Sequence, residues 1–81
     1  TSTIKVTGHT DNVPLLFGSQ YRDNWDLAAA RAASVVQNLQ ETNVIDAKRL
    51  IATSKGETQP IASNQTRQGR SKNRRITKSI Y

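Results

Sequence analysis

Two oppositely charged residues, Asp11 and Arg31, are of the types that could together bind a zwitterionic ligand. Asp11 lies with Thr10 and Asn12 in a polar loop after a β-forming segment, and Arg31 lies on the helical segment that follows. In a strand-loop-helix unit, the end of the strand and the start of the helix meet at one edge of the sheet. There a carboxylate binds an ammonium group, and a guanidinium binds a carboxylate in a bidentate fork. Spacing alone nevertheless favours a simple ion pair between Asp11 and Arg31.

The helical segment presents further side chains beside Arg31. At about 100° per residue, Asn24, Leu27 and Ala28 share a face with Arg31, about a quarter-turn from an apolar stripe. The stripe consists of Trp25, Ala29, Ala32, Val36 and Leu39. Its spacing predicts a helix from about Asn24 to Gln40, capped by Asp23 or Asn24, with the stripe facing the core.

The other elements predict a single small domain, residues 1–81, of the α/β (α+β) class. Strands are expected at Thr3–Thr7, where Gly8 ends the strand, at Leu50–Ser54 and at Arg75–Tyr81. Thr66–Asn73 forms at most a short helix, and residues 9–23 form a loop long enough to suggest a functional role. The strand-helix-strand order implies a parallel pair joined by a right-handed crossover, and the final strand extends the same sheet. The expected architecture is therefore a two-layer sandwich.

The charge of the chain points to an anionic partner. The net charge is +6, and six of the 12 basic residues lie together near the carboxyl end. This basic cluster consists of Arg67, Arg70, Lys72, Arg74, Arg75 and Lys78. It is compatible with nucleic acid, an acidic membrane, a carboxylate-bearing polymer or a solvated surface. No aromatic residue is interleaved with it for base stacking, which argues against nucleic acid.

Cysteine usage and hydropathy leave the compartment open. The chain has no cysteine, which excludes a disulfide framework and a cysteine-based zinc site. No apolar run approaches the roughly 20 residues of a membrane-spanning helix. Because no signal peptide is present, the chain is either cytosolic or targeted by a segment outside it.

Catalysis finds little support in the sequence. His9 is the only histidine, and no nucleophile motif accompanies it. Among Asp11, Asp23, Asp26 and Glu57, no spacing singles out an acid/base pair. His9 and Asp11 fall short of the three or four ligands that a metal site needs. We therefore expect a protein that is not an enzyme and uses no metal or cofactor.

Several short motifs, taken in order, resemble the OmpA-like (OmpA/MotB carboxyl-terminal) domain. The two main ones are Gly8-His9-Thr10-Asp11-Asn12 and Asn24-Trp25-Asp26-Leu27-Ala28-Ala29-Ala30-Arg31-Ala32. Later matches are Arg49-Leu50, Gly56-Glu57, Pro60, Asn64, Thr66, Gly69-Arg70 and Asn73-Arg74-Arg75-Ile76. The loop with Val13-Pro14-Leu15 and the Asn-Trp pair before the helix are more similar to the MotB branch than to the porin branch.

The resemblance implies a periplasmic, non-catalytic domain that binds peptidoglycan through the diaminopimelate of its stem peptide. Carried over by motif, Asp11 and Arg31 hold the zwitterionic end of diaminopimelate, which reverses the preference for a simple ion pair. The resemblance also places Asn24, Leu27 and Thr10 at the ligand, with Arg75 as a neighbour that shapes the site. The parent would be an envelope or flagellar stator protein of the periplasm or outer membrane.

Two departures from the family pattern bear on the site and on stability. Ala28 stands where the family usually has serine. The family's mixed sheet, with helices on one face, also includes a first strand and helix that should precede Thr1. We therefore expect an amino-terminally truncated domain that is poorly stable alone or associates, for example as a homodimer. Any membrane attachment would come from a segment outside the chain. The alternative function is a nucleic-acid-binding module that uses the basic cluster.

Overall fold

The computed structural model of the chain describes residues 2–81, which form three strands, two α-helices and one 3-10 turn. In chain order these are β1 (Ile4–His9), α1 (Asn24–Glu41), η1 (Ala47–Arg49), β2 (Leu50–Gly56), α2 (Arg67–Asn73) and β3 (Ile76–Ile80). The predicted elements are therefore present, with ends shifted by one or two residues. The main difference is at β1, which continues through Gly8 to His9.

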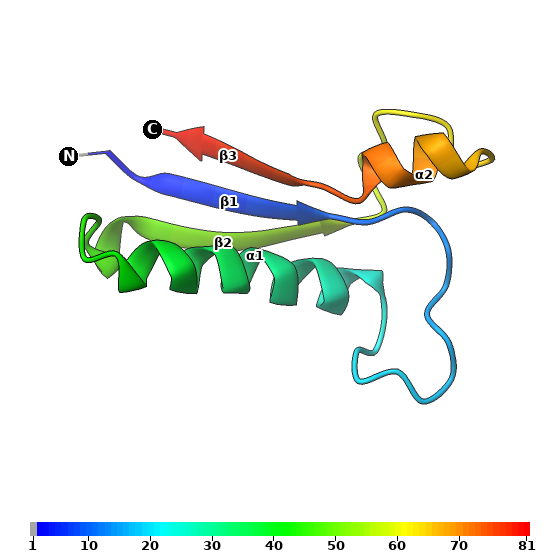
Figure 1. The fold of residues 1–81 in the computed structure, drawn as a ribbon, viewed down its shortest axis with the longest axis horizontal. Coiled ribbons are helices and arrows are strands. Elements are labelled where there is room, and N and C mark those ends of the chain that lie inside the picture. The colour runs from blue at the N-terminus through cyan, green and yellow to red at the C-terminus, as the bar shows by residue number, and fades with distance from the viewer. Residues whose placement is uncertain (1) are drawn as a thin grey trace.

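The three strands form a mixed sheet with β1 in the centre. The order is β2-β1-β3, with β1 parallel to β2 and antiparallel to β3. This confirms the predicted parallel pair and the extension of the sheet by the last strand. Helix α1 packs along β1 and β2 on one face, whereas α2 lies past the carboxyl end of β1 (Figure 1). The two-layer α+β architecture is thus formed mainly by α1 and the sheet.

The buried face of α1 differs from the predicted stripe. Trp25 and Ala29 are exposed, while Ala28 and Ala32 are buried, so the prediction that the first two face the core is wrong. The cause is a close approach of the helix to β1. A Cβ atom at Gly8 would overlap the carbonyl oxygen of Ala28, so a large side chain at the contact is excluded. At the start of α1 the inward face is therefore rotated by one residue from the predicted stripe, and the two agree at Ala32, which is buried as predicted.

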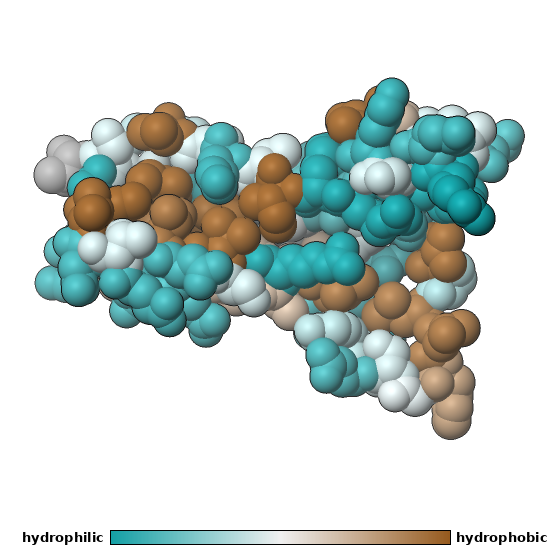
Figure 2. Space-filling model, viewed as in Figure 1, coloured by the Kyte–Doolittle hydropathy of each residue, from teal (hydrophilic) through white to brown (hydrophobic). Residues whose placement is uncertain are grey.

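The core is thin. Among the described residues, the buried apolar side chains are those of Val6, Ala28 and Ala32. Apolar side chains are also visible on the surface, between α1 and the sheet and on the loop below α1 (Figure 2). In that loop Leu16 and Phe17 are exposed. The expected weak stability or association of the chain stays a prediction, to which these exposed side chains give a physical basis.

Candidate functional site

The Asp11 site lies where the chain leaves β1, between the ends of its two neighbouring strands. The His9 amide donates to the Arg75 carbonyl and the Thr10 amide donates to the Gly56 carbonyl, both at 2.9 Å. One bond attaches the end of β1 to the start of β3, and the other attaches it to the end of β2. These contacts hold Thr10 and Asp11 at the edge of the sheet instead of releasing them into the loop.

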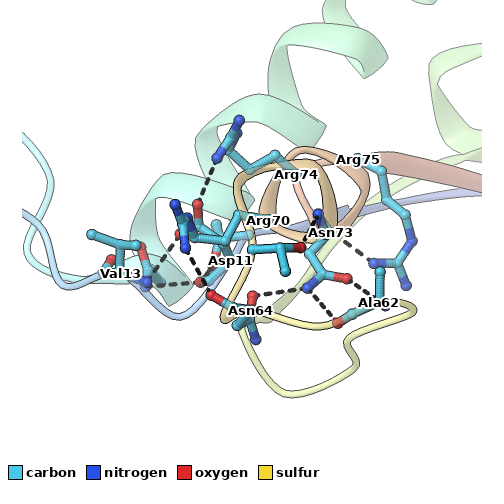
Figure 3. Close-up of polar contacts among 12 residues, drawn as sticks. Asp11, Val13, Ala62, Asn64, Arg70, Asn73, Arg74 and Arg75 are labelled. Carbon is cyan, nitrogen blue, oxygen red and sulfur yellow. Dashed lines mark hydrogen bonds and ion pairs between the residues drawn. The ribbon is translucent and has the colours of Figure 1, made fainter.

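The Asp11 carboxylate is held by two partners on different elements. Its Oδ1 atom accepts from the Val13 amide at 3.0 Å, which forms a turn with the Asp side chain. Its Oδ2 atom forms an ion pair with Nη1 of Arg74 at 2.7 Å (Figure 3). The Asp11 side chain is only 11% exposed and that of Arg74 is 42% exposed. The carboxylate is therefore oriented before any ligand arrives.

Asn24 connects the first turn of α1 to this loop. Its Nδ2 group faces the carbonyl oxygens of Asp11 at 3.3 Å and Val13 at 3.1 Å, with Glu57 Oε1 at 3.5 Å. The Thr10 hydroxyl donates to the same Asp11 carbonyl at 2.8 Å. The structure thus brings together three of the predicted site residues, Thr10, Asp11 and Asn24.

The start of α1 is determined by local capping. Asp23 is the N-cap, and its side chain accepts from the Asp26 amide at 2.9 Å. Asp26 in turn accepts from the Arg22 amide at 3.0 Å. The first bond satisfies a backbone donor that the first helical turn leaves free, and the second attaches the residue before the cap to that turn. They fix the position at which Asn24 enters the site.

Two other predicted site residues, Leu27 and Arg31, lie further along α1. Leu27 is partly exposed and Arg31 is exposed. Within residues 2–81, the Arg31 guanidinium has neither a hydrogen bond nor an ion pair. The simple Asp11–Arg31 ion pair that spacing favours is therefore wrong, because Asp11 pairs with Arg74. Nor do the described residues enclose a pocket. The ligand roles of Leu27 and Arg31 stay predictions.

The two arginines before β3 have different partners. Arg74 reaches Asp11, whereas Arg75 donates to the carbonyl oxygens of Gln59 at 3.0 Å and Asn73 at 3.3 Å. Arg75 therefore supports the loop before α2, and its place beside the ligand stays a prediction. Arg74 was missed by sequence reasoning, although the Asn-Arg-Arg motif contains it. Neighbouring residues entering a strand point to opposite sides, and the motif does not say which one faces Asp11.

Asn73 orders the segment that carries Arg74. It is fully buried, and its Oδ1 atom accepts from the amides of Ile61 at 2.8 Å and Ala62 at 3.0 Å. Its Nδ2 group donates to the Ala62 carbonyl at 3.0 Å and to Asn64 Oδ1 at 2.8 Å (Figure 3). The loop before α2 is therefore attached to the end of the helix directly before Arg74.

His9 lies on the sheet face opposite α1 and is buried. Its Nε2 atom lies 3.2 Å from Thr77 Oγ1, and its Nδ1 atom has no partner among the described residues. Burial lowers the pKa of His9 below the ordinary 6.5, and the positive charges of Arg75 and Lys55 lower it further. A neutral imidazole in this position supports the end of β1.

The basic cluster is partly structural. Arg70 donates to the Asn64 carbonyl at 3.0 Å, and Arg74 and Arg75 make the contacts described above. Within the described chain, Arg67, Lys72 and Lys78 make no side-chain hydrogen bond or ion pair. Half of the cluster is thus used to hold the chain together, which weakens its interpretation as a dedicated polyanion surface.

The chemistry available at the site is recognition of charge. Over residues 2–81 no three His, Cys, Asp or Glu side chains are grouped closely enough to hold a metal ion. No helix in this range is long and apolar enough to cross a membrane. What the site offers is an oriented carboxylate beside a half-exposed guanidinium, an arrangement suited to a ligand with both charges.

Comparison with known proteins gives a consistent result. A family model described as "OmpA family" matches residues 1–74. Motility protein B of Bacillus subtilis is 45% identical over 73 residues, which cover 90% of this chain and 28% of that protein. Outer membrane protein Omp38 of Acinetobacter baumannii is 38% identical over 79 residues, covering 98% of this chain and 21% of that protein.

Solved structures agree with the sequence matches. The periplasmic domain of Helicobacter pylori MotB superposes with a TM-score of 0.82 at 34% identity, covering 98% of this chain and 46% of that one. The cell wall anchor of the T6SS from Pseudomonas aeruginosa gives 0.83 at 39% identity, with 98% and 52% covered. The resemblance to the MotB branch is confirmed. The chain spans only part of the length of each of these proteins.

Proposed function

This chain belongs to the OmpA family, and we propose that it binds peptidoglycan without catalysis and so anchors its parent protein to the bacterial cell wall. The related structures include a cell wall anchor and periplasmic domains of a motility protein. The proposed location is therefore the periplasmic side of the cell envelope. The parent would be a flagellar stator subunit or another envelope protein.

The proposed ligand is the diaminopimelate residue of the stem peptide, whose side chain ends in an ammonium and a carboxylate group. The observation that supports this most is the orientation of Asp11, which is held by the Val13 amide and paired with Arg74. In this proposal the ligand ammonium binds the Asp11 carboxylate, and the ligand carboxylate binds the exposed Arg31 guanidinium. Arg74 then yields part of its ion pair with Asp11 and stays near enough to share the ligand's negative charge.

Binding to a single stem peptide is expected to be weak. Two charge-assisted contacts contribute about 1.5–3 kcal/mol each, and association costs oppose them. The ligand ammonium must also compete with Arg74 for Asp11. Because the wall repeats its stem peptide many times, a dimeric or tethered parent gains affinity through effective concentration. Reversible single contacts and firm overall anchoring are therefore compatible.

The absence of catalysis is part of the proposal. The only histidine is His9; its Nε2 atom contacts the Thr77 hydroxyl, but among the described residues no carboxylate pairs with its Nδ1 atom to orient the ring as a base. The Asp11 carboxylate is occupied by an amide and a guanidinium, which suits binding better than proton transfer.

The test is co-sedimentation with purified sacculi, comparing the diaminopimelate type with the lysine type that lacks the terminal carboxylate. We expect Asp11→Asn and Arg31→Gln each to weaken binding about tenfold or more on diaminopimelate sacculi, the loss of one charge-assisted contact. Glu41→Gln and Lys72→Gln change the same charges at exposed positions and serve as matched controls. Circular dichroism confirms that each variant is folded.

Two results would contradict the proposal. One is equal sedimentation of the parent and Asp11→Asn with release of both by moderate salt, which indicates nonspecific attraction. The other is equal binding to both types of sacculi. The nucleic-acid alternative predicts that Arg67→Gln and Lys72→Gln weaken binding to single-stranded nucleic acid while Asp11→Asn does not.

A further inference from the structure

We infer that Trp25 forms a second subsite, a platform on which a sugar ring of the wall glycan stacks while Asp11 holds the stem peptide. This inference rests on the proposed function, because it concerns another part of the same polymer. Trp25 is the only tryptophan of the chain and the second residue of α1. It is 50% exposed, although it lies on the element that supplies most of the core.

One face of the Trp25 ring packs on a residue that has no side chain. Gly56, the last residue of β2, has a φ of +53°, and a Cβ atom there would lie 3.1 Å from Trp25 Cδ2 and 3.3 Å from Cγ. The backbone at Gly56 thus forms a floor under the indole. A side chain at this position would lift the ring and would also be strained by the positive φ.

The platform is anchored at its backbone as well. The Ser54 hydroxyl donates to the Trp25 carbonyl at 2.8 Å and accepts from the Gly56 amide at 3.1 Å. The Ser54 side chain therefore connects the backbone of Trp25 to that of Gly56, the residue under the indole. A ring held in this way loses little conformational freedom when a ligand stacks on it.

The platform and the Asp11 carboxylate lie on opposite sides of the end of β1. Gly56 belongs to β2, which flanks β1 on one side, and Arg74 precedes β3, which flanks it on the other. The link between them is short, since the Gly56 carbonyl accepts from the Thr10 amide. Asn24, next to Trp25, contacts both the Asp11 carbonyl and Glu57. A ligand that spans this edge can contact both the charged site and the indole.

The chemistry of the platform suits a pyranose ring. An exposed indole face is apolar, and covering it removes a large apolar area from water. The C–H face of a hexosamine is flat and apolar, while its hydroxyl and amide groups point outward. Glu57 follows Gly56 in the sequence and is exposed, and its carboxylate, 3.5 Å from Asn24 Nδ2, can accept from such donors. In peptidoglycan the stem peptide is attached directly to a sugar, so both groups reach the protein together.

The experiment compares two probes, a diaminopimelate tripeptide and the same tripeptide attached to its disaccharide. Calorimetry should show that the parent chain binds the disaccharide-tripeptide about fivefold more tightly, the gain expected of one aromatic stacking contact. Trp25→Ala should abolish this gain and leave the tripeptide affinity unchanged, and Trp25→Phe should retain part of it. Phe17→Ala, which removes another exposed aromatic ring from the loop before α1, should change neither affinity. The intrinsic fluorescence of the single tryptophan should change only with the sugar-bearing probe.

The outcomes separate this inference from the proposed function. Equal affinities of the parent for the two probes, or an equal loss of both affinities in Trp25→Ala, would overturn the platform and leave stem-peptide binding intact. If neither probe binds the parent, both proposals fail. A gain that Trp25→Phe keeps and Trp25→Ala loses, with normal tripeptide binding in both variants, supports the platform.

Discussion

Replacing Asn73 with alanine tests how strongly the segment that carries Arg74 depends on the hydrogen bonds of Asn73 to the loop before α2. The side chain is fully buried and makes four hydrogen bonds, two as acceptor and two as donor, to the loop before α2. At about 1 kcal/mol for each bond, Asn73→Ala should lower the free energy of unfolding by about 4 kcal/mol. Small domains have about 5 kcal/mol or little more in total, so the variant should be close to unfolded.

A graded variant keeps the test informative if Asn73→Ala does not fold. Asn73→Asp retains the acceptor for the amides of Ile61 and Ala62, but places a second oxygen against the Ala62 carbonyl and Asn64 Oδ1. We expect a loss of about 2 kcal/mol or more, from two missing donors. Urea unfolding followed by circular dichroism measures both variants. Hydrogen exchange at the Ile61 and Ala62 amides shows whether the loop opens locally.

The control for both variants is Ser71→Ala, an exposed position on the same helix that makes no side-chain hydrogen bond to the described residues. Its effect should stay within about 0.5 kcal/mol. The reasoning is refuted if Asn73→Ala costs less than about 1 kcal/mol, or no more than Ser71→Ala. Water would then replace the four bonds, and the loop would not depend on Asn73.

Two further changes act on the end of β1. Gly8→Ala should destabilise the fold by about 3 kcal/mol, since its Cβ atom would overlap the Ala28 carbonyl and push α1 off the sheet; an unchanged urea midpoint would contradict this contact. Because the pKa of His9 lies below 6.5 in the folded chain, the unfolded chain takes up the proton first as the pH falls. His9 therefore lowers the free energy of unfolding below pH 6.5 and has no such effect well above that pH. When the pH is lowered from about 7.5 to about 5.5, the melting temperature of His9→Gln should fall less than that of the parent. Equal falls in the two melting temperatures would show that His9 has no such effect.

The positions of the elements were predictable because their signals are local. The α1 helix has a capping aspartate at Asp23 and apolar residues at helical spacing, and the structure begins it at Asn24. Strands β1 and β2 follow from short runs of β-forming residues, and their parallel pairing follows from the helix between them. The loop that carries Thr10 and Asp11 was likewise expected at the end of β1.

The same signals misplaced the inward face of α1. Hydrophobicity alone orients the helix by its largest apolar residue, Trp25, which the structure leaves half exposed. The orientation is determined by the contact of Ala28 with the backbone at Gly8. Such a contact depends on the distance between two elements, and the helical pattern contains no information about that distance.

The sequence by itself determined which charged groups are candidates for the site: Asp11 in the loop after β1, and the arginines at positions 31, 74 and 75. It also determined, through local capping and turn preferences, that Asp11 and Asn24 lie at the same edge of the sheet. Only the tertiary structure decided that Arg74, 63 residues away, pairs with Asp11, while Arg31 has no side-chain partner within residues 2–81 and Arg75 supports a loop. The physical reason is that an ion pair requires nitrogen and oxygen within a few ångströms. That proximity arises from β3 pairing antiparallel to β1 and from Asn73 holding the preceding turn, both of which are contacts between distant parts of the chain.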